Sequence, residues 1–170
     1  MKVRTVSYKS KNNSREFTQS LHQTGFSVLK DHPIDFQLIN SVYSEWEVFF
    51  NNQKKHNYTF DTIKQDGYFP LGTENAKGAS LSDLKEFYHF YLWGKCPNNL
   101  SDNTKELYEQ LVALTSTLLS WIQDETPSNI KSLFSTSLPD MIKDSTSHLL
   151  RIIHYPPLDG TEQIGAIRGG

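Results

Sequence analysis

The spacing of hydrophobic residues predicts two long amphipathic helices. Between Asp35 and Phe50, apolar side chains recur every three or four residues, at Leu38, Ile39, Val42, Trp46, Phe49 and Phe50. This is the 3.6-residue period of a helix that buries one face, and Asp35 can cap its first turn. A second run, from Ser101 to Gln123, repeats leucines at the same interval behind a Ser-Asp cap. We therefore predict helices over both segments.

Shorter segments carry weaker helix signals. Residues 12–25 have apolar positions four apart and end in a glycine, which predicts a short helix with a C-terminal stop. Residues 51–58 are expected to form one or two helical turns or a loop. Residues 128–134 and 138–144 are expected to be short helices joined by Ser/Thr turns.

Three further segments favour strands. Residues 26–29 form a short apolar run, residues 85–93 are rich in aromatic side chains, and residues 148–155 form a nearly continuous apolar run. Residues 66–78, with three glycines and a proline, indicate an ordered loop with strand-like ends. The predicted fold class is α+β, with a helical layer, a few strands and a final strand that comes late in the chain.

The composition narrows the class of protein. The 170 residues are 36% hydrophobic and 21% charged, which is typical of a globular chain, and the formal net charge of -2 gives no basic excess for nucleic acid or an anionic membrane. A single cysteine excludes an intrachain disulfide and suits a reducing compartment. Because no run of 18 apolar residues occurs, we expect no membrane span and a cytoplasmic location.

The sequence offers no recognisable metal or nucleophile motif. None of the six histidines is followed two residues later by Asp or Glu, the spacing that would place two ligands on one strand face. No His-Glu-x-x-His, phosphate-binding glycine loop or Gly-x-Ser-x-Gly elbow is present. We therefore assign no catalytic and no metal-binding residue. Lys85 and Glu86 are interpreted as a solvated edge or a local ion pair, and His89 as a core or inter-strand residue.

Arg151 and Tyr155 are the candidate binding residues. In a strand over residues 148–155, both would point to the same side as Leu149 and Ile153. Two hydrogen-bond donors among apolar neighbours can receive a carboxylate. The alternative, an arginine whose stem covers apolar surface beside a core tyrosine, is favoured by spacing alone.

Three stretches, taken in order, resemble one enzyme family. They are "TGFSVLKDHPID" at residues 24–35, "DGYFPLGTENAKGASLSDLKEFYHF" at residues 66–90 and "LLRIIHYPP" at residues 149–157. Together they resemble the isopenicillin N synthase-like family of non-haem iron oxygenases, most of which use 2-oxoglutarate. The second stretch matches the family pattern at Gly67, Tyr68, Gly72, Glu74, Asp83, Lys85, Glu86, Phe87 and Phe90. The agreement in order and spacing covers residues 16–168.

The resemblance implies an architecture. Residues 1–147 would be the N-terminal helical/β region of a double-stranded β-helix (jelly-roll) oxygenase. Residues 148–170 would be the first strand and loop that lead to the catalytic barrel, most of which would be missing. In the family a His-x-Asp or His-x-Glu motif follows this strand within a few residues, so we expect the sequence to end about where the first iron ligand would stand.

The resemblance also suggests roles for single residues. Tyr155 matches a tyrosine that binds the 2-oxoglutarate carboxylate in many members, whereas Ile153 stands where the family pattern has Asn, which puts that contact in doubt. Arg151 matches a strand arginine with a structural or pocket-lining role. The cofactors implied for the family are iron(II) and 2-oxoglutarate, and we expect neither to bind well to this chain.

The expected function is that of the N-terminal part of an iron(II)- and 2-oxoglutarate-dependent oxidoreductase that acts on a small molecule, inactive as the 170-residue chain. The alternatives are a non-catalytic degenerate relative that serves as a binding or interaction module, and an unrelated α+β binding domain. We further expect the unpaired barrel edge to pair, either by self-association of the chain or with another polypeptide that supplies the missing strands.

Overall fold

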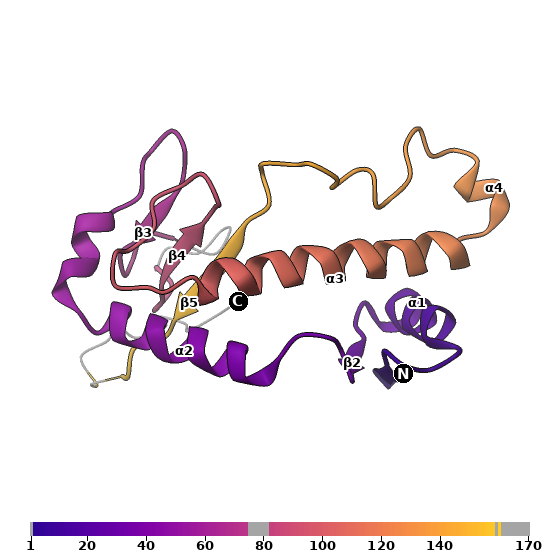
Figure 1. Ribbon diagram of the computed structural model, residues 1–170, viewed down its shortest axis with the longest axis horizontal. Coiled ribbons are helices and arrows are strands. Elements are labelled where there is room, and N and C mark those ends of the chain that lie inside the picture. The colour runs from indigo at the N-terminus through magenta and orange to yellow at the C-terminus, as the bar shows by residue number, and fades with distance from the viewer. Residues whose placement is uncertain (1, 75–81, 159, 161–170) are drawn as a thin grey trace. The chain divides into compact units, whose positions relative to one another are not determined.

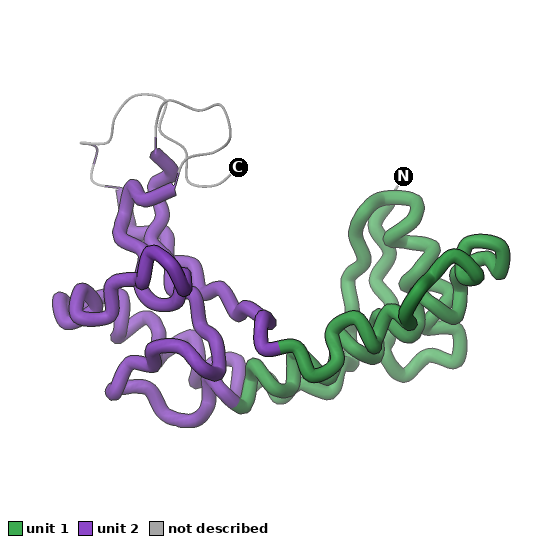
Figure 2. Tube along the Cα trace, turned by 90° about the horizontal axis from the view of Figure 1, so that it is seen from above, with its two compact units in different colours: residues 1–36, 106–145 green, residues 37–105, 146–170 purple. Residues whose placement is uncertain are grey.

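A computed structural model describes residues 2–74, 82–158 and 160 of the chain. The chain divides into two compact units, residues 1–36 with 106–145 and residues 37–105 with 146–170 (Figure 2). The boundaries between the units fall within two helices labelled in Figure 1: after the first residue of α2 (Phe36–Phe50) and after the third residue of α3 (Asn103–Glu125). Each unit is therefore built from segments that are distant in sequence.

The first unit contains a parallel pair of short strands. β1 (Thr5–Ser7) pairs with β2 (Val28–Lys30), and α1 (Asn13–Thr24) connects them. The predicted helix over 12–25 is confirmed, and the predicted strand over 26–29 is found two residues later. β1 was not predicted, because a three-residue strand is too short to show a period.

A buried serine ties α1 to both strands. The Ser20 hydroxyl, which has no exposed surface, donates to the Phe26 carbonyl at 2.7 Å and accepts from the Arg4 N–H at 3.1 Å. Gly25 ends the helix at φ +76°, and its N–H donates to the Leu21 carbonyl at 2.8 Å. These bonds turn the chain from the helix into β2.

The segment after α3 is less helical than predicted. Only α4 (Ser128–Lys131) forms within residues 128–134, and residues 138–144 form turns instead of a helix. After one i→i−4 bond, from the Met141 N–H to the Ser137 carbonyl at 3.1 Å, the backbone bonds there join residues three apart, from Ile142 to Pro139 at 3.2 Å and from Ser145 to Ile142 at 3.3 Å. Bonds between residues three apart form turns and do not continue an α-helical ladder.

The second unit is built on a three-stranded antiparallel sheet. β3 (Gly67–Phe69), β4 (Glu86–Phe90) and β5 (Leu150–His154) lie in the order β3-β4-β5 (Figure 1). A 3₁₀ helix, η1 (Gln53–Tyr58), follows α2. Strands are found in both segments predicted to form them, residues 85–93 and 148–155, and at the strand-like start of residues 66–78. Each strand is shorter at its ends than predicted. The other end of 66–78 lies outside the described residues.

Aromatic side chains form the core of this unit. Trp46 and Phe49 of α2 pack on Tyr88 of β4, with ring centroids 4.9 and 5.5 Å apart. Tyr88 has no exposed surface and Trp46 only 2%. The Trp46 indole N–H donates to the hydroxyl of buried Thr104 at 2.9 Å, which joins the start of α3 to α2. The predicted apolar face of α2 is thus confirmed as core.

The fold class is confirmed as a mixture of helices and strands. Within the part of the chain that the structure describes, no closed barrel is formed and no helix is long and apolar enough to cross a membrane. The proposed division at residue 147 stays a prediction.

Thr104→Val should destabilise the protein by about 1–3 kcal/mol, because it leaves the buried Trp46 N–H without an acceptor. Thr115→Val is the matched control: Thr115 lies on the same helix but is exposed, so its substitution should stay within about 0.5 kcal/mol of wild type. Urea unfolding followed by tryptophan fluorescence measures both. Equal effects of the two substitutions would contradict the assigned role of the indole bond.

Candidate functional site: the two faces of the β3-β4-β5 sheet

β4 divides its side chains between two faces of the sheet. Alternation places Glu86 and Tyr88 on one face and Phe87 and His89 on the other. Strand pairing extends both sets to β5, since Glu86 lies opposite His154 and His89 lies opposite Arg151. The first face packs on α2, and the second carries the candidate residue Arg151.

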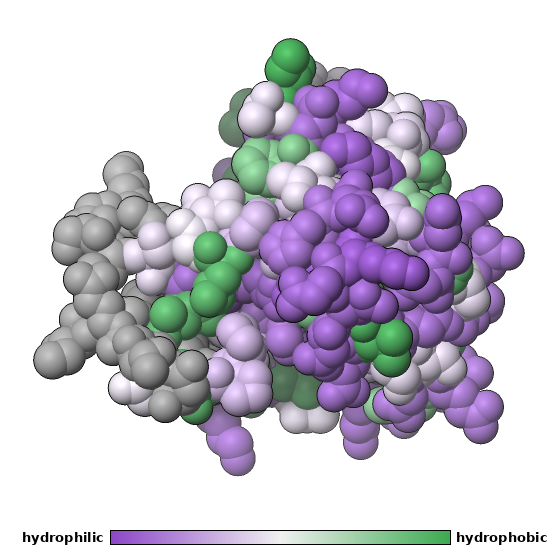
Figure 3. Space-filling model, turned by 90° about the vertical axis from the view of Figure 1, so that its left-hand side faces the viewer, coloured by the Kyte–Doolittle hydropathy of each residue, from purple (hydrophilic) through white to green (hydrophobic). Residues whose placement is uncertain are grey.

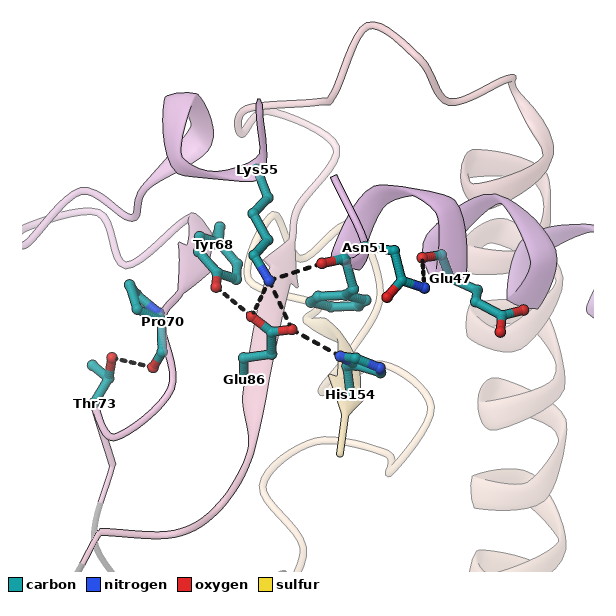
Figure 4. Close-up of polar contacts among 9 residues, drawn as sticks. Glu47, Asn51, Lys55, Tyr68, Pro70, Thr73, Glu86 and His154 are labelled. Carbon is teal, nitrogen blue, oxygen red and sulfur yellow. Dashed lines mark hydrogen bonds and ion pairs between the residues drawn. The ribbon is translucent and has the colours of Figure 1, made fainter. Parts of the chain in front are cut away.

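Glu86 is the centre of a buried hydrogen-bond network, which we call the Glu86 cluster: Glu86, Lys55, Tyr68 and His154 (Figure 4). The Lys55 ammonium lies 2.8 and 3.0 Å from the two carboxylate oxygens, and His154 Nδ1 lies 2.8 Å from one of them. The Tyr68 hydroxyl donates to the other oxygen. Glu86 is only 4% exposed, so protein donors replace water around its charge.

The cluster sets the ionisation of its members. Burial by itself would raise the pKa of the Glu86 carboxyl, but the hydrogen bonds from Lys55, Tyr68 and His154 outweigh burial, and the pKa is lowered. Burial and the neighbouring Glu86 carboxylate raise the pKa of Tyr68 well above its ordinary range. Glu86 is therefore a carboxylate and Tyr68 a neutral phenol at neutral pH.

The interpretation of Glu86 as a solvated edge residue is wrong. The aromatic run that contains it lies in the centre of a three-stranded sheet, and Glu86 points to the face that packs on α2. The local ion pair is found at Lys85, whose ammonium lies 2.7 Å from Asp83 and 3.0 Å from Glu74. Tyr68 and Glu86 both match the family pattern, but the pattern predicted no functional role for either residue.

On the opposite face, Arg151 is engaged within the chain. One guanidinium nitrogen lies 2.5 Å from Glu74, and the guanidinium carbon lies 3.8 Å from the centre of the Phe87 ring. The Arg151 side chain is 30% exposed. Packing and ion pairing thus account for much of its surface.

His89 lies on the same face as Arg151. Its Nδ1 is 3.0 Å from the Gln65 carbonyl, which can only accept, so Nδ1 carries the proton. Burial lowers the pKa of His89, and the positive charge of Arg151 lowers it further. His89 is therefore a neutral inter-strand histidine, as the sequence predicted.

Tyr155 is the first residue after β5 and is 41% exposed. Ile153, two residues earlier and opposite Phe87, is 42% exposed. No bound carboxylate tests the roles assigned to Tyr155 and Arg151, which stay predictions.

The described residues do not fit iron. Among residues 2–74, 82–158 and 160, no three His, Cys, Asp or Glu side chains are grouped so that they could hold a metal ion. A cavity of about 450 Å³ beside the Glu86 cluster is lined by Phe49, Asn52, Lys54, Lys55, Asn57, Tyr58, Asn98 and Asn99. Because this lining has neither a carboxylate nor an imidazole, it offers none of the ligands that iron prefers.

Comparison with known proteins identifies the family. The family model described as "non-haem dioxygenase in morphine synthesis N-terminal" matches residues 6–112. A crystal structure of a Shewanella oneidensis protein, named as an oxygenase, is similar with 44% identity and a TM-score of 0.87, over 99% of this chain and 59% of that chain. No curated protein matches significantly.

Two more distant structures share the fold. A Caulobacter crescentus protein, named as a member of the 2OG-Fe(II) oxygenase family, has 23% identity and a TM-score of 0.68, over 96% of this chain and 59% of its own. A full-length Neurospora crassa protein in complex with alpha-KG (2-oxoglutarate) has 18% identity and a TM-score of 0.72, over 98% of this chain and 59% of its own.

The fold is thus that of the N-terminal region of a non-haem dioxygenase. The chain belongs to the non-haem dioxygenase family that the family model describes, as the sequence resemblance predicted, and spans about 59% of the length of these three relatives.

Glu86→Gln should lower the free energy of unfolding at pH 7 by roughly 1–3 kcal/mol, because Lys55 loses the carboxylate that it pairs with. The folded-state pKa of Glu86 is below its ordinary value of 4.5, so its contribution is present above pH 4.5 and is lost as the pH falls through the lowered pKa. The difference between variant and wild type should therefore shrink below pH 4.5. Urea unfolding between pH 7 and pH 3 measures it.

Glu47→Gln, on an exposed position of α2, serves as the control and should stay near wild type at every pH. A gap between wild type and Glu86→Gln that is constant down to pH 3 would show that the Glu86 charge does not stabilise the fold.

Proposed function

We propose that this chain forms the N-terminal part of an iron(II)- and 2-oxoglutarate-dependent oxygenase that oxidises a small molecule. The observation that carries the proposal is the 44% identity to a named oxygenase over 99% of the chain. A single free cysteine is consistent with a reducing, cytoplasmic environment.

The chain's own contribution would be a scaffold wall. The Glu86 face of the sheet is closed by α2. On the opposite face Phe87 is only 2% exposed, because Phe69 and Arg151 cover it, so the side available for a bound molecule is the end of β5 at Ile153 and Tyr155. In this proposal Tyr155 donates to a carboxylate of 2-oxoglutarate, and Arg151 lines the pocket. Ile153 offers no hydrogen bond, so the contact rests on Tyr155. Because the described residues do not fit iron, we assign iron ligation to none of them and propose that the 170-residue chain does not turn over.

A chimera tests the proposal. The chain would replace the matching 59% of the Shewanella oneidensis relative, joined to the remainder of that protein. Provided that the intact relative converts 2-oxoglutarate to succinate, the chimera should do so too, and only with iron(II). Tyr155→Phe in the chimera should raise the KM for 2-oxoglutarate about tenfold, because it removes one hydrogen bond to a charged group. A folded chimera that forms no succinate would favour the non-catalytic binding module.

The 170-residue chain alone should hold 2-oxoglutarate no better than about 1 mM, or roughly 4 kcal/mol, because two donors act without a metal. Anaerobic titration with iron(II) and 2-oxoglutarate, followed by absorbance and calorimetry, measures this affinity. A stoichiometric complex with a metal-to-ligand charge-transfer band, or succinate formation in air, would show that the chain contains a complete site.

We also propose that the chain self-associates through β5. β5 is an edge strand of the described sheet, and Leu149, Ile153 and Tyr155 are each 41–43% exposed. An apolar edge of this kind is a template for pairing with another strand. The face of the molecule shown in Figure 3 is mostly hydrophilic, with small separate hydrophobic areas, so a general apolar surface does not explain association there.

Light scattering at increasing concentration should show association that Ile153→Lys weakens. Ile63→Lys is the control, because Ile63 is 90% exposed but lies in the loop between η1 and β3. A monodisperse monomer at high concentration, or equal effects of the two substitutions, would contradict pairing through β5.

A further inference from the structure

The carboxyl end of β5 is held by one side chain in particular. Within the described sheet, β5 pairs only with β4, and its last paired residue is His154, opposite Glu86. His154 Nδ1 lies 2.8 Å from Glu86, and the His154 ring stacks on Phe50 with centroids 5.0 Å apart and planes 19° apart. The end of the strand therefore has a polar and an apolar attachment in addition to its backbone bonds.

Both attachments are themselves fixed. Glu86 accepts from Lys55 of η1 and from Tyr68 of β3, so its carboxylate cannot rotate without breaking bonds to two other elements. The Lys55 ammonium also donates to the Phe50 carbonyl at 2.8 Å, which connects the residue that stacks on the His154 ring to the same carboxylate. His154 thus lies between two groups that one lysine connects.

The hydrogen bond from His154 to Glu86 is more directional than the stacking on Phe50, because the carboxylate is charged and buried. Glu86 is 4% exposed, and the other charged or titratable groups of the cluster are Lys55 and Tyr68. A hydrogen bond to a buried carboxylate has a narrow range of distance and angle, whereas stacked rings can slide. The bond to Glu86 therefore restricts the orientation of the His154 side chain more than the stacking on Phe50 does.

We propose that Glu86 is a positioning residue that acts through His154 to fix the orientation of Tyr155. The two residues are adjacent, so a displacement of His154 passes to Tyr155 through a single peptide unit, and edge-strand ends are the parts of a sheet that open most easily. This inference rests on the proposed function, because Tyr155 is the residue proposed there to hold 2-oxoglutarate. A misplacement of about 1 Å at a binding group is enough to impair a site.

Two substitutions separate the polar from the apolar attachment. His154→Phe keeps a ring for Phe50 but removes the donor to Glu86. His154→Asn places an amide nitrogen near the position of Nδ1 but removes the ring. Ile152→Val is the control, because it changes the same strand and leaves the Glu86 cluster intact.

The readout is the Tyr155 ring signal in the 170-residue chain with ¹³C-labelled tyrosine, assigned by its loss in Tyr155→Phe, together with amide exchange of β5. We expect His154→Phe to shift or broaden the Tyr155 signal and to speed exchange at the end of β5 at least tenfold. His154→Asn should restore most of the wild-type signal, and Ile152→Val should not change it. A wild-type Tyr155 signal in His154→Phe, or equal disturbance by the Phe and Asn variants, would overturn the inference.

The same variants in the chimera separate this inference from the proposed function. If the chimera works, His154→Phe should raise the KM for 2-oxoglutarate more than it lowers kcat, and His154→Asn should do so less. If the chimera never forms succinate, the proposed function fails, while the Tyr155 signal still decides whether Glu86 positions it.

Discussion

The buried Glu86 carboxylate is the constraint on which the second unit depends. Removing a carboxylate from water costs several kcal/mol unless donors replace the lost solvent. Here the donors come from three separate elements, η1, β3 and β5, and none of them is near Glu86 in sequence. The charge is satisfied only when all three elements lie in place. Burial of the Glu86 carboxylate would be unfavourable without these donors. With them, it favours the one arrangement of the sheet that brings all three together.

The sequence predicted those parts of the fold that follow a local period. The two long helices and the strand of residues 148–155 were found because each buries a face or a continuous run, and burial leaves a pattern in the sequence. The turns of residues 138–144 were missed because their backbone bonds join residues three apart, such as Ile142 to Pro139, and the apolar spacing does not distinguish such turns from a helix.

The Glu86 cluster could not be predicted in the same way. Lys55 precedes Glu86 by 31 residues and His154 follows it by 68, so their convergence depends on tertiary structure. The only local signal was an acidic residue at the start of an aromatic run, where strand alternation places it on the same face as Tyr88. Arg151 shows the same limit. Its place on β5 was predicted, but its partner Glu74 lies 77 residues earlier.

The two faces of the sheet therefore differ in what they can contribute to an oxygenase. On the Glu86 face, the charged cluster groups bond to one another and the helix closes the surface, so that face stabilises the fold. On the other face, the Arg151 charge is matched by Glu74 and its guanidinium lies on Phe87. A ligand carboxylate could recruit Arg151 only in competition with Glu74, whereas Ile153 and Tyr155 are already partly exposed. In the proposed oxygenase, recognition by this part of the chain would thus depend on shape and on Tyr155 more than on a free positive charge.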